Sequence, residues 1–436
     1  MPALGFGILW LLIDELRKLY IRTFPRSIAA KIACVTVRVN SQICHGVSQY
    51  DQCSTNNACG CLRRIDATDN IGICGFLRMT CSQFIPCESS NNTCNEPDHI
   101  CIYHPRCRSH PICYPLSMTD KEICPPKTTL PYIPPNSNWT QDGTSVAGGN
   151  GIGRKLNQLS NPFGFYMDDT QTLYIADLWN HRIVEWKTNA ISGQVVAGGK
   201  GEGNSTNQLS RPKDVIIDKK NDSLIICDSN NQRVLRWPLQ GGTSGQTIIE
   251  NITCWGLTMD NEGFLYVPAS EGHEVRRWRV GETNGIVVAG GNGRGDRLDQ
   301  LNSPAFAFVD QHHSVFVADK NNHRVMKWMK GMSEGIIVAG GQGEGDALTQ
   351  LDYPEGVIVD QLGTVYVADC NNHRIMRWKK GDTQGSIVVG GNGHGNQTNQ
   401  LYYPTSLSFD QQGNLYVVDD WNQRVQKFLI EESSRN

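Results

Sequence analysis

Five aspartates between residues 177 and 419 are each followed by an arginine five residues later. Such a carboxylate and guanidinium could take part in catalysis or form a bidentate ion pair across a turn. The pattern belongs to a repeat that occurs six times in the chain. Its third copy separates these alternatives, because Ala269 replaces the aspartate and Glu274 replaces the arginine. Since both partners are lost together, the pattern predicts structural ion pairs. The predicted pairs are Asp177–Arg182, Asp228–Arg233, Asp319–Arg324, Asp369–Arg374 and Asp419–Arg424.

The histidines next to these arginines are also predicted to be structural. His181, His323 and His373 occupy the same repeat position as Gln232 and Gln423. An amide can replace an imidazole as a hydrogen-bonding group in a turn, but it cannot act as a general base. We therefore do not expect a catalytic histidine at this position.

Glycine-rich runs such as 148–153 resemble phosphate-binding loops. A nucleotide-binding loop follows a strand, opens a helix and occurs once, whereas these runs recur after strand after strand with no helix behind them. Their glycines are expected to provide turns with positive φ. The sequence therefore predicts no nucleotide site here.

Candidate binding residues lie where the repetition fails. The third copy lacks the glycine loop and has Trp255 where the other copies have proline. The residue after each of those prolines also varies, and it includes Lys213 and Glu355. Because ligand sites favour loops and concave surfaces, we predict a partner-binding notch around Trp255 on the loop-bearing face.

Three further candidates follow the paired aspartates. Trp179 and Trp421 lie in neighbouring repeats, and exposed aromatic side chains suit protein or glycan surfaces. Asp420 directly precedes Trp421. We include all three among the candidate binding residues of the same face; the alternative is that each tryptophan covers its own repeat.

The elements that position these residues are six copies of one pattern about fifty residues long. In the fifth copy, 356–360, 364–369, 373–379 and 386–391 read as four short antiparallel strands. Four strands per unit predict a propeller blade. The last copy lacks its fourth strand, and 144–149 supplies one ahead of the first copy. The sequence thus predicts an all-β, six-bladed propeller over 144–430, closed by an N-terminal strand, with a tail at 431–436.

A cysteine-rich module over 34–124 precedes a Pro-rich linker over 125–143. The cysteines lack the paired spacing of zinc sites, so we predict disulfides and an oxidising compartment. The disulfide candidates are Cys44, Cys53, Cys59, Cys61, Cys74, Cys81, Cys87, Cys94, Cys101, Cys107, Cys113, Cys124, Cys227 and Cys254.

An oxidising compartment implies an extracellular or secretory-pathway location, and two further features of the sequence bear on this prediction. Residues 1–33 begin with a ten-residue apolar run, which favours either an atypical signal or membrane anchor, or an amphipathic helix or poorly defined start. Glycosylation sequons agree with a secretory route. The candidate sites are Asn91, Asn138, Asn204, Asn221, Asn251 and Asn396.

The N-H-R tripeptides at 181, 323 and 373 are near the defining motif of NHL repeats, and residues 144–430 resemble an NHL-family six-bladed β-propeller. That resemblance implies a platform for protein or RNA. The repeats hold 27 Lys or Arg against 32 Asp or Glu, which disfavours nucleic acid. We therefore predict a non-enzymatic extracellular or surface-displayed protein that binds a protein or glycan and needs no cofactor.

The resemblance also leaves an alternative open. Some relatives, including the peptide-amidating lyases, are enzymes, which would imply a hydrolase or lyase with a divalent metal in the channel. Glu355, Asp420 and His273 are available as ligands, although no spacing singles them out.

Overall fold

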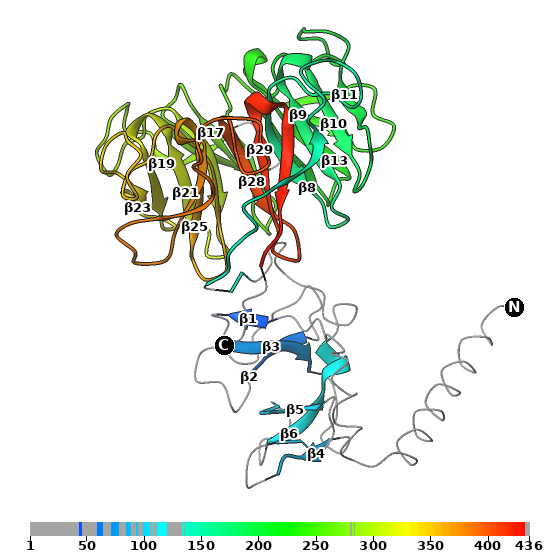
Figure 1. Ribbon diagram of the computed structural model, residues 1–436, viewed down its shortest axis with the longest axis vertical. Helices are drawn as coiled ribbons and strands as arrows, with labels where there is room; N and C mark the ends of the chain where they lie inside the picture. Colours follow the sequence, from blue (N-terminus) through cyan, green and yellow to red (C-terminus); the bar gives the residue numbers. More distant parts are fainter. Residues whose placement is uncertain are drawn as a thin grey trace, which may run out of the picture. The chain divides into compact units, whose positions relative to one another are not determined.

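The computed structural model describes residues 43–45, 59–63, 71–77, 84–88, 93–94, 99–104, 107, 111–119, 133–134, 136–279, 281–282 and 284–431. The chain forms two compact units, residues 1–127 and 128–436 (Figure 1). The predicted leader over 1–33 lies outside the described residues. Among the residues that are described, no helix is long and apolar enough to cross a membrane.

The first unit contains two small antiparallel sheets among its described residues. One has the order β1 (Ile43–His45), β3 (Ile71–Phe76), β2 (Cys59–Arg63), and the other β4 (Ile85–Pro86), β6 (Ile112–Pro115), β5 (His99–Ile102). A short 3-10 helix, η2 (Leu116–Thr119), follows β6. The core includes Leu62, Ile102, Ile112 and Tyr114, a small apolar content that needs covalent support.

Disulfides provide that support, as the sequence predicts. Bonds join Cys87 to Cys101 and Cys94 to Cys113. Cys59, Cys61, Cys74 and Cys107 are also disulfide-bonded. Cys53, Cys81 and Cys124 lie outside the described residues.

The second unit contains six four-stranded antiparallel sheets within its described residues, and the predicted all-β propeller fold is confirmed. The first strands are β8 (Pro162–Met167), β12 (Asp214–Asp218), β16 (Thr258–Met259), β20 (Pro304–Val309), β24 (Pro354–Val359) and β28 (Pro404–Phe409). The second strands are β9 (Leu173–Asp177), β13 (Ser223–Asp228), β17 (Phe264–Ala269), β21 (Val315–Asp319), β25 (Val365–Asp369) and β29 (Leu415–Asp419).

The outer strands complete each sheet. The third strands are β10 (Arg182–Trp186), β14 (Arg233–Pro238), β18 (Glu274–Arg279), β22 (Arg324–Trp328), β26 (Arg374–Trp378) and β30 (Arg424–Phe428). The fourth strands are β11 (Gln194–Gly198), β15 (Gln246–Glu250), β19 (Ile286–Gly290), β23 (Ile336–Gly340), β27 (Ser386–Gly390) and β7 (Thr144–Gly148).

The ring closes by pairing the two ends of the repeat array. Strand β7 pairs with β30, and Gly148 lies opposite Arg424. Strand β28 also lies beside β8, so the last sheet packs against the first (Figure 1). This is the closure that the sequence predicts, and it leaves no unpaired fourth strand in the last sheet.

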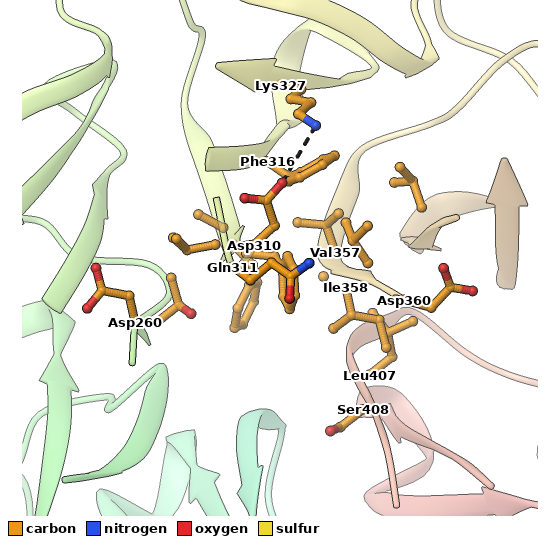
Figure 2. Close-up of a pocket in the computed structure, with 18 of the residues that line it drawn as sticks. Asp260, Asp310, Gln311, Phe316, Lys327, Val357, Ile358, Asp360, Leu407 and Ser408 are labelled. Carbon is orange, nitrogen blue, oxygen red and sulfur yellow. Dashed lines mark ion pairs between the residues drawn. The ribbon is translucent and has the colours of Figure 1, made fainter. Parts of the chain in front are cut away.

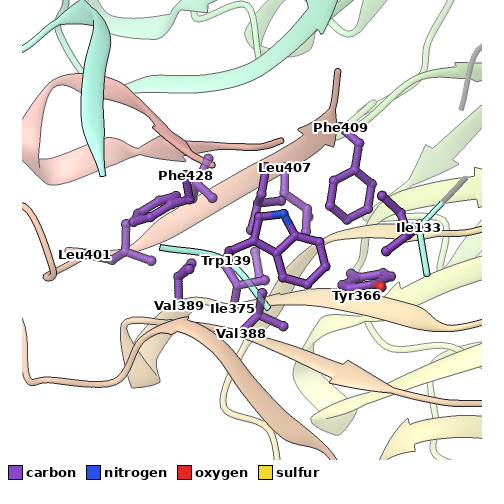
Figure 3. Packing of buried hydrophobic residues seen from close by; sticks show 13 residues of the cluster. Ile133, Trp139, Tyr366, Ile375, Val388, Val389, Leu401, Leu407, Phe409 and Phe428 are labelled. Carbon is purple, nitrogen blue, oxygen red and sulfur yellow. The ribbon is translucent and has the colours of Figure 1, made fainter. Parts of the chain in front are cut away.

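The end of the predicted linker packs onto the propeller. Trp139 is only 2% exposed, and its indole Nε1 donates to Gly413 O at 2.9 Å. Its ring stacks on Phe409 and meets Tyr366 edge-on, while Ile133 joins the same cluster (Figure 3). Proline content suggested an extended spacer over 125–143, but the apolar Ile133 and Trp139 bind its second half to the fifth and sixth sheets.

Candidate functional site

The five Asp and Arg pairs hold the glycine-rich loops in place. Arg374 Nε lies 2.7 Å from Asp369 Oδ2, and the Asp369 side chain is fully buried. The same guanidinium donates to the carbonyls of Asp346 at 2.7 Å and Ala347 at 3.3 Å, in the glycine-rich loop that precedes the fifth sheet. Equivalent ion pairs, all at 2.7 Å, occur in four other repeats. Each arginine therefore ties a surface loop to a buried carboxylate.

The histidine position links neighbouring repeats. His373 Nδ1 accepts a hydrogen bond from the Tyr403 amide at 3.2 Å. In the last repeat, Gln423 Oε1 accepts from the Asn161 amide at 2.6 Å. An imidazole nitrogen and an amide oxygen thus do the same work, which explains why the two residue types alternate.

The third repeat is fastened differently. Glu274 pairs with Arg276 within its own strand instead of across the turn. Cys254 is joined by a disulfide to Cys227 of the second repeat, with their Cα atoms 5.8 Å apart. The bond fixes the backbone directly ahead of Trp255.

Trp255 meets four side chains from four other repeats, and we call these five residues the mouth cluster. They lie where the first strands begin or, for one of them, where a second strand ends. The members are Phe163, Lys213, Trp255, Lys320 and Glu355.

The mouth cluster is built on the Trp255 ring. Its Nε1 donates to Glu355 Oε2 at 2.9 Å, and Phe163 contacts the ring edge-on with centroids 5.9 Å apart. The Lys213 ammonium lies 2.8 Å from the ring centroid and 5.4 Å from that of Phe163. Lys320 Nζ lies 4.3 Å from the Trp255 centroid and 2.6 Å from Glu355 Oε1. Both oxygens of the one carboxylate are therefore engaged.

The charges of the mouth cluster are unequal. Burial lowers the pKa of Lys213 to about 7, and the nearby Lys320 lowers it further against the opposing effect of Glu355. Burial also acts to lower the pKa of Lys320, but its contact with Glu355 outweighs this and the pKa is raised. The cluster thus contains two amines and one carboxylate. Lys320 forms the ion pair with that carboxylate, and Lys213 has no direct ion pair among the described residues.

Asp420 lies close enough to act on this cluster. It begins the 3-10 turn η7 (Asp420–Asn422), is 8% exposed, and its Oδ1 has no hydrogen-bond partner among the described residues. Burial raises the pKa of its carboxyl to about 8, and the charge of Glu355 adds to the rise. Its carboxyl is therefore mostly protonated at neutral pH.

The two other aromatic candidates do not join the mouth cluster. Trp179 is 45% exposed and carries the Arg211 guanidinium 4.1 Å above its ring. Trp421 is 54% exposed and packs beside Tyr402 and Tyr403, with centroids 5.2 Å away in each case. Thus, of the six candidate binding residues, three meet at Trp255, Asp420 acts from nearby, and two lie elsewhere on the surface.

Two of the three donors proposed for a metal are committed to other contacts. Glu355 holds Lys320 and the Trp255 indole, and His273 Nδ1 accepts the Ser303 amide at 3.1 Å. The His273 contact is of the same kind that the other histidines make between repeats. Glu355 and His273 are therefore engaged, and of the three only Asp420 keeps a carboxylate oxygen without a hydrogen-bond partner among the described residues.

Two members of the mouth cluster, Phe163 and Lys320, were not among the six predicted binding residues, and the clearest omission is Lys320. It occupies the position after the paired aspartate, where the other repeats carry residues that differ from copy to copy. The corresponding residues are Leu178, Ser229, Ser270, Cys370 and Asp420. A lysine among mostly small or apolar residues was the available signal, and comparison of the six copies at this position would have found it.

A cavity of about 1940 Å³ lies between the first strands (Figure 2). Its lining is largely apolar, as at Val357, Ile358 and Leu407, with aspartates where the strands end. Asp310 forms a 3.6 Å ion pair with Lys327, and its Oδ1 accepts the amides of His312 and Ser314. Because the same two-amide pattern recurs at Asp260 and Asp360, these carboxylates cap turns.

Solved structures with the same fold come from several bacteria. A Bacteroides thetaiotaomicron VPI-5482 protein of unknown function is 14% identical, with TM-score 0.55 over 85% of this chain and 87% of its own. An auxiliary nutrient binding protein from the same strain is 15% identical, with TM-score 0.54 over 68% and 78%. Another from Bacteroides ovatus ATCC 8483 is 12% identical, with TM-score 0.51 over 85% and 89%. At these identities the likeness shows the fold alone.

Sequence comparison identifies the repeat. No curated protein matches the chain significantly. The NHL repeat family model matches residues 351–377 and 401–428, which lie in the fifth and sixth copies. These matches show that the fifth and sixth copies contain NHL repeats, and the propeller fold of the whole array is consistent with an NHL-repeat protein.

Proposed function

We propose that the chain is a non-enzymatic, extracellular or surface-displayed protein whose propeller binds a protein or glycan at the mouth cluster. The observation that carries this proposal is the excess of positive groups beside Trp255. Two lysines and two aromatic rings lie around one carboxylate whose two oxygens are both already in contact with other groups. Aromatic side chains with a buried cation are typical of binding hot spots. The cluster also lies where the repeats differ most, which is where a ring of similar units acquires specificity.

The proposed location rests on the cysteines and sequons. Disulfides such as Cys87–Cys101 and Cys227–Cys254 form and persist in oxidising compartments. Five of the six sequon asparagines are exposed, and the sixth, Asn91, lies outside the described residues. Attachment to a membrane through residues 1–33 remains part of the proposal, and no cofactor is required by it.

The test is a binding screen with the full chain. Fluorescent tetramers of the protein would be applied to arrays of purified extracellular proteins and of glycans. We expect Trp255→Ala to weaken binding to the true partner at least tenfold, because it removes the ring on which both lysines lie. Met332→Ala, at an exposed residue in the loop between β22 and β23, serves as the control. Equal binding by both variants would overturn the assignment of the site.

A further inference from the structure

The Lys213 ammonium has no direct ion-pair partner among the described residues. Its described neighbours are the faces of Trp255 and Phe163, at 2.8 Å and 5.4 Å from the ring centroids. The nearest carboxylate, Glu355, already contacts Lys320 at 2.6 Å and the indole at 2.9 Å. Aromatic faces attract a cation, but they do not neutralise it. One further negative charge would balance the two lysines.

We propose that the mouth cluster binds a carboxylate group of a protein partner, with Lys213 as the ion-pair partner and the Trp255 and Phe163 rings as apolar walls. This inference rests on the proposed binding function and specifies the chemistry recognised. An aspartate or glutamate side chain, or the carboxylate of a C-terminus, brings one negative charge on a small group. That matches one unpaired lysine between two rings.

The surroundings disfavour other anions and neutral sugars. A phosphate would bring a second negative charge toward Glu355, which already acts on Lys213. A sugar needs several hydrogen-bonding groups, yet the nearby Thr405 hydroxyl already donates to Phe163 O at 2.6 Å. A single carboxylate avoids both costs.

The site also predicts a coupling between binding and protons. Burial lowers the pKa of Lys213 to about 7, with Glu355 acting against and Lys320 adding to the shift, so about half of the amine is neutral at pH 7. A carboxylate binds the charged form, and binding should therefore take up a proton. Above pH 7 the affinity should fall by up to tenfold per pH unit, which gives about a tenfold loss between pH 6 and pH 8.

The probe for this test is benzoate, with the neutral isostere benzamide as the matched ligand. Titration of the full chain, followed by Trp fluorescence, should show benzoate binding at pH 6, with affinity about tenfold lower at pH 8. Benzamide should bind at least tenfold more weakly than benzoate. Calorimetry in two buffers of different ionisation enthalpy should report net proton uptake at pH 7.

Variants at Lys213 separate recognition from structure. Lys213→Met should abolish benzoate binding, whereas Lys213→Arg should retain it and remove most of its decline between pH 6 and pH 8, because arginine stays charged and only the partial ionisation of Asp420 remains. Lys200→Met, an exposed lysine of a glycine loop, is the control. Equal binding of benzoate and benzamide, or an unchanged pH profile in Lys213→Arg, would overturn the inference.

The two proposals can fail separately. If a partner found by the screen is lost with Trp255→Ala but binds Lys213→Met normally, the binding function stands and the carboxylate does not. If benzoate behaves as expected but only a neutral glycan binds through Trp255, the site takes carboxylates without a protein partner supplying them, and this inference is wrong as stated.

Discussion

The third and fifth repeats solve the same structural problem in two ways. In the fifth, Arg374 joins the buried Asp369 to the carbonyls of a glycine-rich loop. In the third the loop is missing, Ala269 replaces the aspartate, and the Cys227–Cys254 disulfide fastens the chain instead. The ion pair is therefore present where a loop needs it and absent where there is no loop. In the third repeat, Trp255 lies where the missing loop would lead into the sheet, and it contacts Lys213 and Lys320 of the neighbouring repeats.

Breaking the fifth-repeat ion pair should have the largest effect. Arg374→Met leaves Asp369 buried without its cation and frees the loop, which should cost about 3–5 kcal/mol of unfolding free energy. The measurement is denaturant-induced unfolding. In the third repeat, Glu274→Gln affects only a partly exposed pair with Arg276 and should cost about 0–1 kcal/mol. Similar losses in both variants would show that the two repeats are not held differently.

Removing the disulfide tests the other half of the comparison. The double change Cys227→Ser and Cys254→Ser opens a bond with a sequence separation of 27 residues and should cost roughly 2–4 kcal/mol. Cys370→Ala, which removes a buried free thiol, should cost about 1 kcal/mol and serves as the control. A double variant as stable as the control would mean that the third repeat needs no substitute fastening.

The smallest effect concerns pH and Asp420. Its carboxyl has a pKa of about 8 in the folded protein, against an ordinary value of 3.8. The folded state therefore holds a proton that the unfolded state releases, so this contribution to stability is present below about pH 4 and lost as pH rises toward 8. Relative to wild type, Asp420→Asn should gain at least about 1 kcal/mol between pH 5 and pH 8. Thermal unfolding at both pH values measures it, and a constant difference would contradict the raised pKa.

Repetition explains how much of this could be predicted. Aligned copies predict the strands and the Asp and Arg pairing because these features recur along one chain, and the missing fourth strand of the last copy predicts the closing β7. The mouth cluster depends on contacts between repeats, which no single copy encodes. Trp255, Lys213 and Glu355 stood out as departures, but their meeting point and Lys320 required the three-dimensional ring. Trp139 was missed because a proline-rich context concealed a buried anchor.

The most direct test of the mouth as the binding site is site-specific photo-crosslinking with the full chain. A benzophenone amino acid would replace Tyr353, which lies beside Lys320, or His312, which lies in the turn at the other end of the first strands. We predict that the partner from the array screen crosslinks from position 353 and not from position 312. Equal crosslinking at both positions, or crosslinking only at 312, would contradict the account.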